Sequence, residues 1–450
     1  MLTQTLFGTD GIRGKAGQYP LDPPTIKLIG YFLARRLGTG SLIVIGRDTR
    51  ESGLWIEEAI SRGITLGGGK TVTAGIIPTP GVALLTRELK ANAGVVISAS
   101  HNPYQDNGLK IFSPSGQKLN DEMEMAISED VAFIGPALVS TFDRSTYESP
   151  EPRPELADRY IDYLQSLIVG TFGIDRLKIV LDCANGAASH IAPILFTSLG
   201  ANVSVINASP DGLNINSDCG ALHPANLQNL VVELGADLGF AFDGDADRLM
   251  LVDGKGNLLD GDSILYLIAD HLHQQQMLTG NRVVATVMSN LGLELALRKR
   301  QIELVRTPVG DKFVLDELLR GGGSVGGEQS GHIILPEISF AGDGMVTALQ
   351  ILRILAKTGQ TVNQLAAGMV RMPQILINLP VREKRPFEEM PPVTEALTRL
   401  EEEMAGSGRI LLRYSGTENL VRIMIEGVDE ATIRKQANSL ALLLQAELNP

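Results

Sequence analysis

Short apolar runs recur along the chain, and each leads into a segment rich in Gly, Asp, Asn or Ser. Four examples are residues 43–48, 95–100, 179–186 and 283–290. Such runs indicate buried strands, and helical patterns often follow them. This alternation predicts α/β layers in which helices pack on mainly parallel sheets. In folds of this kind, functional loops lie at the carboxyl ends of strands.

The pattern changes near Arg371-Met372-Pro373. Beyond it we expect strands at 375–381, 409–414 and 420–426 and helices at 393–404 and 430–448, an order typical of a small α+β domain. A proline-rich break at 149–154 and a turn at 253–257 divide the rest. The length of 450 residues suits about three or four domains. We predict four, at residues 1–153, 154–256, 257–371 and 372–450.

Composition narrows the class of protein. Hydrophobic residues make up 44% of the chain, which supports large cores, yet no apolar stretch is long enough to span a bilayer. The start lacks the basic and apolar regions of a signal peptide, and the chain has only two cysteines, so we expect a cytoplasmic protein without disulfides. The net charge of −13 disfavours nucleic acid or an anionic membrane as a partner.

Three aspartates alternate with small residues in Asp243-Gly244-Asp245-Ala246-Asp247, directly after the apolar run 238–242. If this segment is extended, its three carboxylates share one face and repel each other unless a hard cation lies between them. A calcium-binding EF-hand is excluded, because its sixth and twelfth positions hold Arg248 and Gly254. A solvated acidic turn remains the alternative.

The loop Ser98-Ala99-Ser100-His101-Asn102-Pro103 follows an expected strand at 94–97. Ser100 is a candidate nucleophile or phosphate carrier. The alternative is an Asn-Pro turn with hydrogen-bonding serines. Lys110, just beyond, could supply positive charge, although a single lysine is more often solvated.

Two further loops carry polar side chains between glycines or strands. The segment 326–332 contains Glu328, Ser330 and His332, a set suited to the hydroxyls of a sugar, with a flexible glycine turn as the alternative. The segment 413–419 joins two expected strands. Its arginine, hydroxyls and glycine backbone, with Arg422 nearby, suit a phosphate dianion, and the alternative is a hairpin with surface arginines.

Together with Phe7-Gly8-Thr9-Asp10-Gly11-Ile12-Arg13-Gly14, these loops in this order resemble the α-D-phosphohexomutase superfamily over nearly the whole chain. Segments 286–290 and 309–312 and Gln329 resemble its bacterial branch that acts on glucosamine phosphates. The resemblance implies an α/β fold of four domains: three related α/β domains and a smaller C-terminal α+β domain around a central cleft. Asn419 departs from the proline common in that branch, which bears on loop rigidity.

The resemblance also implies the site residues. Ser100 would carry an activating phosphate and, with Asp243, Asp245 and Asp247, bind one Mg²⁺ per chain. Catalytic groups would be Ser100, Arg13, Lys110, Arg248 and His332, with Lys110 and His332 as candidate general bases. Glu328 and Ser330 would bind the sugar, and the distal phosphate would lie on Arg413, Ser415, Gly416, Thr417 and Arg422.

The implied reaction interconverts glucosamine 6-phosphate and glucosamine 1-phosphate through a 1,6-bisphosphate. It would supply precursors of UDP-N-acetylglucosamine and the cell wall. Glucose or glucosamine 1,6-bisphosphate is a candidate activator, and a monomer or homodimer is expected. Alternatives are a mutase for glucose or mannose phosphates, a phosphatase, and a non-catalytic sugar-phosphate-binding protein.

Overall fold

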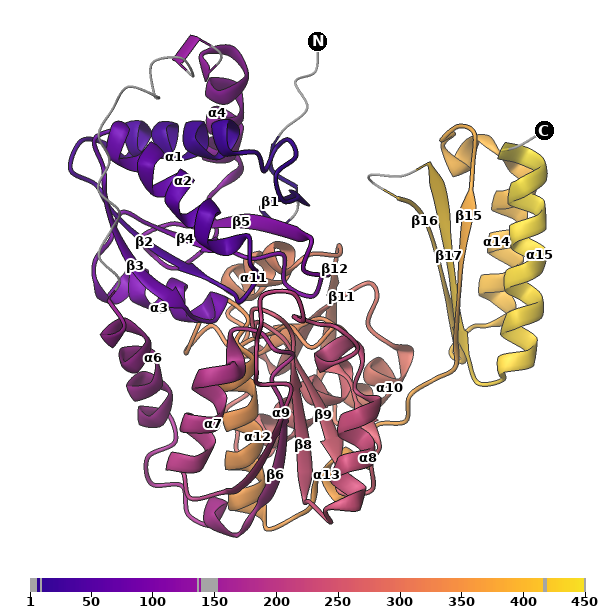
Figure 1. Ribbon diagram of the computed structural model, residues 1–450. Coiled ribbons are helices and arrows are strands. Elements are labelled where there is room, and N and C mark those ends of the chain that lie inside the picture. The colour runs from indigo at the N-terminus through magenta and orange to yellow at the C-terminus, as the bar shows by residue number, and fades with distance from the viewer. Residues whose placement is uncertain (1–5, 9, 136, 139–152, 416–418, 449–450) are drawn as a thin grey trace.

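A computed structural model describes residues 6–8, 10–135, 137–138, 153–415 and 419–448. Four sheets follow one another along the chain, and the last belongs to a C-terminal unit that stands beside the other three (Figure 1). The four runs singled out above form β2 (Leu42–Arg47), β4 (Ala93–Ile97), β6 (Lys178–Asp182) and β11 (Arg282–Thr286). The predicted alternation of strands and helices is confirmed.

The first unit has the strand order β1-β5-β4-β2-β3. Its remaining strands are β1 (Ile12–Lys15), β3 (Lys70–Ile76) and β5 (Asp106–Phe112), and its helices are α1 (Pro23–Leu37), α2 (Gly53–Leu66), α3 (Thr79–Glu88) and α4 (Asp121–Phe133). Strand β2 pairs in parallel with β3 and β4, whereas β5 runs antiparallel to both of its neighbours. Helix α6 (Glu155–Ser166) then leads into the second unit.

The second unit has the strand order β10-β9-β8-β6-β7 and the third β12-β11-β13-β14. Their strands are β7 (Asn202–Ile206), β8 (Leu238–Phe242), β9 (Leu249–Asp253), β10 (Leu258–Leu259), β12 (Glu303–Thr307), β13 (Gly326–Gly327) and β14 (Ile333–Ile334). Their helices are α7 (Ala188–Ser198), α8 (Ala225–Glu233), α9 (Gly261–Gln274), α10 (Leu291–Lys299), α11 (Asp311–Gly321), α12 (Gly344–Thr358) and α13 (Val362–Ala366).

The first three sheets are mixed: six of their eleven strand pairs are parallel, and each sheet has its antiparallel pairs on one side. Strand β8 pairs in parallel with β6 but antiparallel with β9, and β13 pairs in parallel with β11 but antiparallel with β14. The reason lies in the loops. The connections after β4, β8 and β13 are too short to hold a crossover helix, so the chain returns antiparallel. These are the connections that carry the candidate site residues.

One hydrophobic core runs from one face of the first sheet through the second and third units. The other face of the first sheet packs against α1, α2 and α4 around a separate core. The C-terminal unit has its own core. The first three units are therefore packed as one body, and the C-terminal unit is an independent layer.

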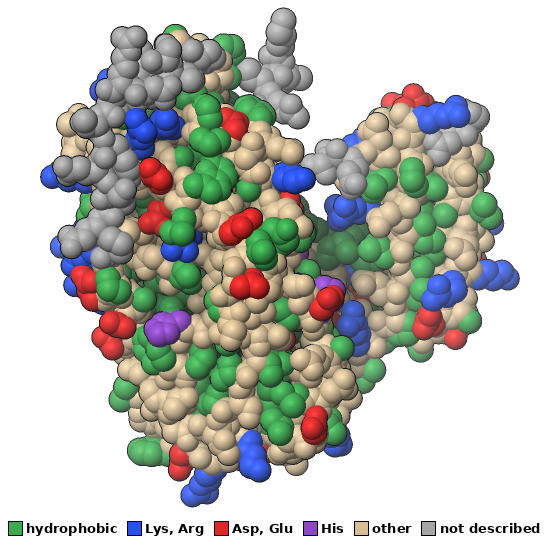
Figure 2. Space-filling model, in the orientation of Figure 1, with side chains coloured by type: hydrophobic (Ala, Val, Ile, Leu, Met, Phe, Trp, Pro, Cys, Tyr) green, Lys and Arg blue, Asp and Glu red, His purple; other side chains and the backbone are tan. Residues whose placement is uncertain are grey.

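The C-terminal unit confirms the predicted order of elements: β15 (Gln374–Pro380), α14 (Pro391–Glu403), β16 (Gly408–Tyr414), β17 (Leu420–Gly427) and α15 (Glu430–Leu448). It is anchored to the third unit through Arg409, which donates to the carbonyls of Val287 at 3.1 Å and Ser289 at 2.9 Å. Glu426 adds contacts to this anchor, accepting from the Asn290 side chain at 3.0 Å and the Leu291 N–H at 3.2 Å. Beyond these contacts a hollow lies between the C-terminal unit and the body (Figure 2). None of the described helices is long and apolar enough to cross a membrane.

Candidate active site

Ser100 lies in a loop that is held from both sides. Parallel strands β2 and β4 end side by side, with Arg47 opposite Ile97, so the residues that follow them meet. The Ser98 hydroxyl donates to Asp48 Oδ2 at 2.7 Å and accepts from the Ser100 backbone N–H at 2.9 Å. Ser100 itself has φ +53°, a left-handed conformation that is unfavourable for a residue with a side chain. Its surroundings therefore fix the direction of its hydroxyl.

Arg50 stabilises the same loop through hydrogen bonds to its backbone carbonyls. Its guanidinium is fully buried and pairs with Asp48 at 2.9 Å. It also donates to the carbonyl oxygens of Ser100 at 2.9 Å and Asn102 at 2.8 Å, and to those of Pro103 and Asp106. A buried guanidinium with this many hydrogen-bond acceptors preorganises the turn that carries Ser100. Asp48 and Arg50 were not predicted from the sequence, and Ser98 was considered only as a hydrogen-bonding serine of the turn.

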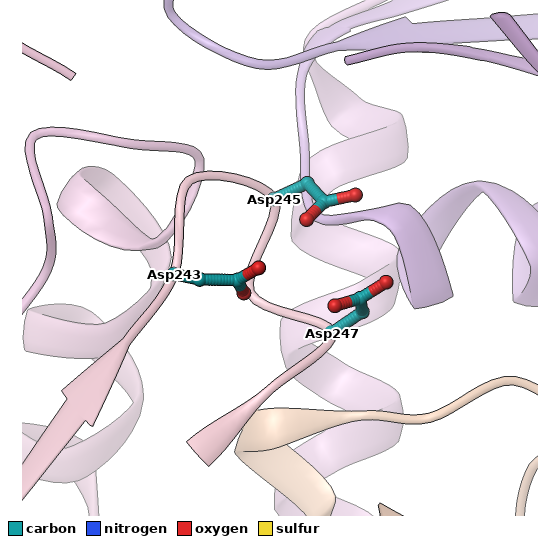
Figure 3. Close-up of side chains that lie close together, drawn as sticks. All are labelled: Asp243, Asp245 and Asp247. Atoms are coloured by element: carbon teal, nitrogen blue, oxygen red, sulfur yellow. The ribbon is translucent and has the colours of Figure 1, made fainter. Parts of the chain in front are cut away.

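The three aspartates lie in the connection from β8 to β9, and they converge (Figure 3). The segment is a turn with Ala246 at φ +53°, so the condition of an extended segment is not met. The convergence holds nonetheless, because buried oxygens of Asp243, Asp245 and Asp247 all lie within 4.8 Å of one another. A turn that curls around its own side chains brings carboxylates together as well as a strand face does.

Each carboxylate is held by protein donors on one side. Asp243 accepts from the Ser100 hydroxyl at 2.7 Å, and Asp245 Oδ2 accepts from Thr79 Oγ1 at 2.6 Å. Within the described part of the chain, Asp245 Oδ1 and Asp247 Oδ1 are buried without a hydrogen-bond partner. Buried unpaired carboxylate oxygens are unfavourable. Oxygens of this kind, close together, fit a hard divalent cation such as Mg²⁺.

The pKa of Asp243 fits the same conclusion. Burial raises it well above its usual range, and the neighbouring Asp247 and Asp245 raise it further. A divalent cation between the carboxylates would offset this repulsion and favour their ionised form.

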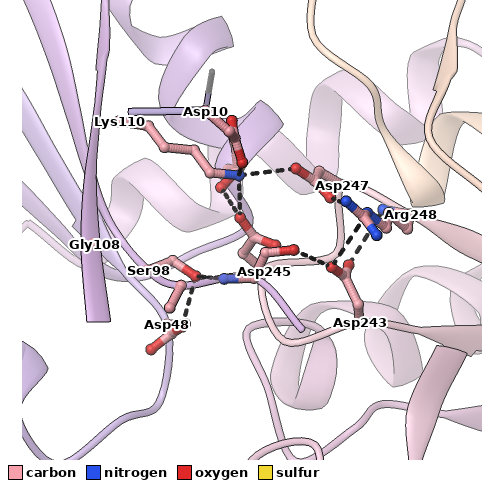
Figure 4. Close-up of polar contacts among 12 residues, drawn as sticks. Asp10, Asp48, Ser98, Gly108, Lys110, Asp243, Asp245, Asp247 and Arg248 are labelled. Atoms are coloured by element: carbon pink, nitrogen blue, oxygen red, sulfur yellow. Dashed lines mark hydrogen bonds and ion pairs between the residues drawn. The ribbon is translucent and has the colours of Figure 1, made fainter. Parts of the chain in front are cut away.

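Basic groups surround the aspartates (Figure 4). Lys110 Nζ is buried and lies 2.9 Å from Asp245 Oδ2 and 3.0 Å from Asp247 Oδ2. Burial lowers the pKa of Lys110, but its carboxylate neighbours outweigh burial and raise that pKa well above its usual range. Arg248 Nε lies 3.7 Å from Asp247 Oδ1 and 4.0 Å from Asp243 Oδ2. Both residues are cations beside the trio.

His332 and Arg13 complete the centre. The ring nitrogens of His332 face two carboxylates, Asp247 Oδ2 at 3.7 Å and Asp311 Oδ2 at 3.5 Å. Burial lowers the pKa of His332, but these carboxylates outweigh it and raise the pKa to about 9. Arg13 pairs with Asp10 and reaches the carbonyl of Ala99 at 3.5 Å.

His101 lies beside Ser100. No role was predicted for this histidine from the sequence. Its Nδ1 lies 3.3 Å from Ser100 Oγ. Burial, with the positive charges of Arg248 and Arg13, lowers the pKa of His101 to about 4. The imidazole beside the serine is therefore neutral at physiological pH.

The loop expected to bind the sugar, residues 326–332, packs against the hairpin of β8 and β9, whose connection carries the three aspartates. The Leu249 N–H, at the start of β9, donates to the Gly331 carbonyl at 3.1 Å. Glu328 accepts from the Gly310 N–H at 3.2 Å and from the Ser330 hydroxyl at 3.3 Å. Glu328 and Ser330 are thus oriented next to the trio, on a loop that the third unit presents to the second.

The residues expected to bind the distal phosphate lie apart from this centre, on the C-terminal unit (Figure 1). Arg413 and Arg422 are directly opposite each other on β16 and β17. Burial and the charge of Arg422 lower the pKa of Arg413. Like charges in such a cross-strand pair are unfavourable unless an anion lies between them. Ser415 is buried at the strand end, and Gly416 and Thr417 lie outside the described residues.

A positioned serine, a carboxylate trio and clustered cations in a multidomain α/β protein define a phosphoryl-transfer enzyme. Models of all four phosphoglucomutase/phosphomannomutase domains match the chain: α/β/α domain I at 4–135, domain II at 158–256, domain III at 260–372 and the C-terminal domain at 376–443. The chain belongs to the phosphoglucomutase/phosphomannomutase family.

Curated relatives are similar along their whole length. A phosphoglucosamine mutase of Desulforamulus reducens is 48% identical over 442 residues, which cover 97% of this chain and 98% of the relative. The phosphoglucosamine mutase of Pseudomonas aeruginosa PAO1 is 46% identical over 446 residues, 98% of this chain and 99% of the relative.

Solved structures share the fold at lower identity. A phosphoglucomutase/phosphomannomutase family protein from Burkholderia thailandensis has a TM-score of 0.78 at 24% identity, covering 99% of this chain and 98% of that one. An N-acetylphosphoglucosamine mutase from Aspergillus fumigatus, in complex with GlcNAc-6P and magnesium, has a TM-score of 0.66 at 18% identity, covering 98% and 95%.

Proposed function

We propose that this chain interconverts glucosamine 6-phosphate and glucosamine 1-phosphate by way of a phosphoserine at Ser100. The relatives that share almost half of its residues are named phosphoglucosamine mutase. One observation of the structure carries the proposal: the Ser100 hydroxyl lies 2.7 Å from a carboxylate of the buried trio, so the phosphate carrier and the cation site are one site.

Asp243, Asp245, Asp247 and an oxygen of phospho-Ser100 would hold Mg²⁺, which when bound neutralises charge on the transferring phosphoryl group. The protein supplies the rest of the positive charge. A phosphoserine carries about −1.5 to −2 and a substrate phosphate a similar charge. Arg13, Lys110, Arg248 and His332 lie where this charge gathers, as phosphoryl transfer by positioning and electrostatics requires.

In the forward half-reaction the bond between Ser100 Oγ and phosphorus breaks, and a bond forms from phosphorus to the free sugar oxygen. The sugar hydroxyl gives up its proton and the serine regains one. Lys110 and His332 are ion-paired cations in this arrangement, so we propose that both stabilise charge rather than act as resting general bases.

The sugar must then turn over so that its second phosphate faces Ser100. Glu328 and Ser330 would bind hydroxyls in both orientations. Arg413, Ser415, Gly416, Thr417 and Arg422 would bind whichever phosphate is distal. Glucose or glucosamine 1,6-bisphosphate would phosphorylate Ser100 and so activate the enzyme. We expect the protein to work in the cytoplasm, as a monomer or homodimer.

Intact-protein mass spectrometry and turnover measurements test the serine's role. We expect one phosphoryl group on the wild type and none on Ser100→Ala, with turnover lost in that variant. Ser115→Ala removes an exposed serine beyond β5 and serves as the control, with unchanged phosphorylation and rate. Undiminished turnover of Ser100→Ala would exclude the carrier.

Rates on glucosamine, glucose and mannose phosphates, measured side by side, test the substrate. We expect the highest kcat/KM on glucosamine phosphate. A higher value on either of the other two would assign the chain to the alternative mutases, and release of inorganic phosphate without isomerisation would assign it to the phosphatases.

A further inference from the structure

Six charged side chains from the first three units form a closed ring of alternating sign. In order around the ring they are Asp10, Lys110, Asp247, His332, Asp311 and Lys118. The successive contacts are 3.4, 3.0, 3.7, 3.5, 2.6 and 2.5 Å, the last one closing the ring from Lys118 to Asp10. No member of the ring has a side chain more than 26% exposed.

Four of the six ring members belong to the centre described above. Lys110 and His332 contact the trio through Asp247, and Asp10 pairs with Arg13. The other two members are Lys118 and Asp311, and the proposed mechanism gives neither of them a part. They line a cavity of about 140 Å³ together with Phe112, Leu119 and Phe340.

Lys118 links two carboxylates of the ring. Its ammonium bridges Asp10 and Asp311, which approach it from the first and third units. Burial lowers the pKa of Lys118, but Asp311 and Asp10 outweigh it and raise that pKa. Burial likewise raises the pKa of Asp311, while Lys118 and His332 lower it. The bridging charges are therefore present at neutral pH.

Asp311 also has contacts at the start of its own helix. It is the first residue of α11, where a carboxylate is favoured by the helix dipole, and it accepts from the Lys312 N–H at 2.9 Å. Its other contacts go to Lys118 and His332. Removing Lys118 would take one counter-charge from two partly buried carboxylates, and each would be free to reorient against its remaining partner, Asp10 against Lys110 and Asp311 against His332.

We propose that Lys118 and Asp311 are positioning residues of the mutase: Lys118 orients Asp10 and Asp311, which in turn hold Lys110 and His332 against Asp247. This rests on the function proposed above. The ring also joins residues of the first three units, so it fixes the reaction centre where the units meet. Displacing catalytic groups by about 1 Å is enough to lower a rate about 100-fold.

Lys118→Met removes the ammonium and keeps an apolar stem. We expect kcat to fall about 10- to 100-fold with KM changed less than about threefold. Lys118→Arg should recover most of the rate, because guanidinium can bridge the same two carboxylates. In the double variant Lys118→Met/Asp311→Asn, the fold loss in kcat should not exceed the product of the two single losses, because both substitutions break the same contact.

Lys312→Met is the matched control. Lys312 lines the same cavity and neighbours Asp311 in sequence, but its ammonium pairs with the exposed Asp121 outside the ring. We expect its kcat and KM to match the wild type. Single-turnover transfer from phospho-Ser100 should slow in Lys118→Met to the same extent as kcat, which locates the defect in the chemical step.

Three results would overturn the proposal: wild-type kcat in Lys118→Met, an equal loss in Lys312→Met, or a loss in Lys118→Met that tracks only its unfolded fraction and is not restored by arginine. Ser100→Ala, assayed in parallel, separates the two claims. If it abolishes turnover while Lys118→Met is normal, the ring proposal fails and the proposed function stands. If Ser100→Ala remains active, the proposed function itself fails.

Discussion

The Ser100 hydroxyl donates a 2.7 Å hydrogen bond to Asp243 Oδ2, although the two residues are 143 positions apart in the chain. The first belongs to a loop after β4 and the second to a loop after β8. Gly244 allows this approach, because a side chain at that position would collide with the carbonyl oxygen of Ser100. The contact places the proposed phosphate carrier beside the candidate cation site.

The free carboxylate oxygens predict how metal should matter. Chelation should abolish turnover, and added Mg²⁺ should restore it. Asp245→Asn removes one ligand charge and leaves Oδ1 as a weaker acceptor. We therefore expect the Mg²⁺ concentration for half-activation to rise at least about tenfold. Losses of this size in metal affinity are typical when a residue that supports a metal ligand is replaced. A magnesium titration of activity measures this. An unchanged titration curve would contradict the metal assignment.

The buried pair of Arg50 and Asp48 predicts a stability effect with a catalytic consequence. Arg50→Met leaves the Asp48 carboxylate buried without its partner, which typically destabilises a fold by about 3–5 kcal/mol. Because the guanidinium also holds the Ser100 carbonyl, the folded fraction should lose most of its activity. Thermal unfolding and kcat, measured on the same preparation, check both effects.

The double variant Asp48→Asn/Arg50→Met is its control. It removes the unpaired charge, so it should regain part of the lost stability but not the activity. Equal stability of the single and double variants would show that the charge of Asp48 is not the cause.

The contact between the C-terminal unit and the third unit predicts a binding effect. Arg409 pairs with the buried Glu426 and donates to two carbonyls near Ser289. Arg409→Ala should loosen the unit that presents Arg413 and Arg422. We expect KM to rise about tenfold with a smaller change in kcat, since in the proposed function this unit binds whichever phosphate is distal in each half-reaction. Solution scattering should show a wider distribution of sizes, and an unchanged KM would contradict this role.

Asp262 predicts a pH dependence of stability. Burial and the neighbouring Asp260 raise its pKa to about 7. The folded state therefore keeps a proton that the unfolded chain loses near pH ~4. The stabilisation is fully present below that pH and is lost as pH rises through about 7.

Melting temperatures of variants isolate the contribution of Asp262. Between pH 5 and 8 the melting temperature of Asp262→Asn should fall less than that of the wild type. Asp316→Asn, an exposed change on α11, should follow the wild type. The comparison is needed because Asp343, with a pKa raised by burial to about 6, titrates in the same range. Parallel profiles of Asp262→Asn and the wild type would refute the assignment.

Local patterns were enough to predict the strands, the aspartate trio, the Ser100 loop and the order of the C-terminal elements. They were not enough for the conformation of the 243–247 turn, since a left-handed Ala246 has no signature in the sequence. Asp48 did have a signal that was missed. It follows one strand as Ser98 follows another, and the ends of neighbouring parallel strands meet.

The ring of charged side chains could not be predicted from local sequence patterns. Lys118 and Asp311 are 193 residues apart and come from different units, so their pairing depends on how those units pack. Asp10 and Arg13 were singled out only through the resemblance of their motif. The domain boundaries at 153/154, 256/257 and 371/372 stay predictions, and most of the proline-rich break at 149–154 lies outside the described residues. Limited proteolysis would test them.

Transfer of an isotopically labelled phosphoryl group from Ser100 tests the central claim most directly. Labelled phosphoenzyme is mixed with excess glucosamine 6-phosphate, and the products are separated after a single turnover. We predict that the label leaves the protein at the rate of catalysis and appears in the 1,6-bisphosphate and then in the sugar monophosphates. Isomerisation that proceeds while the label stays on the protein, or is released only as inorganic phosphate, would contradict the shuttle.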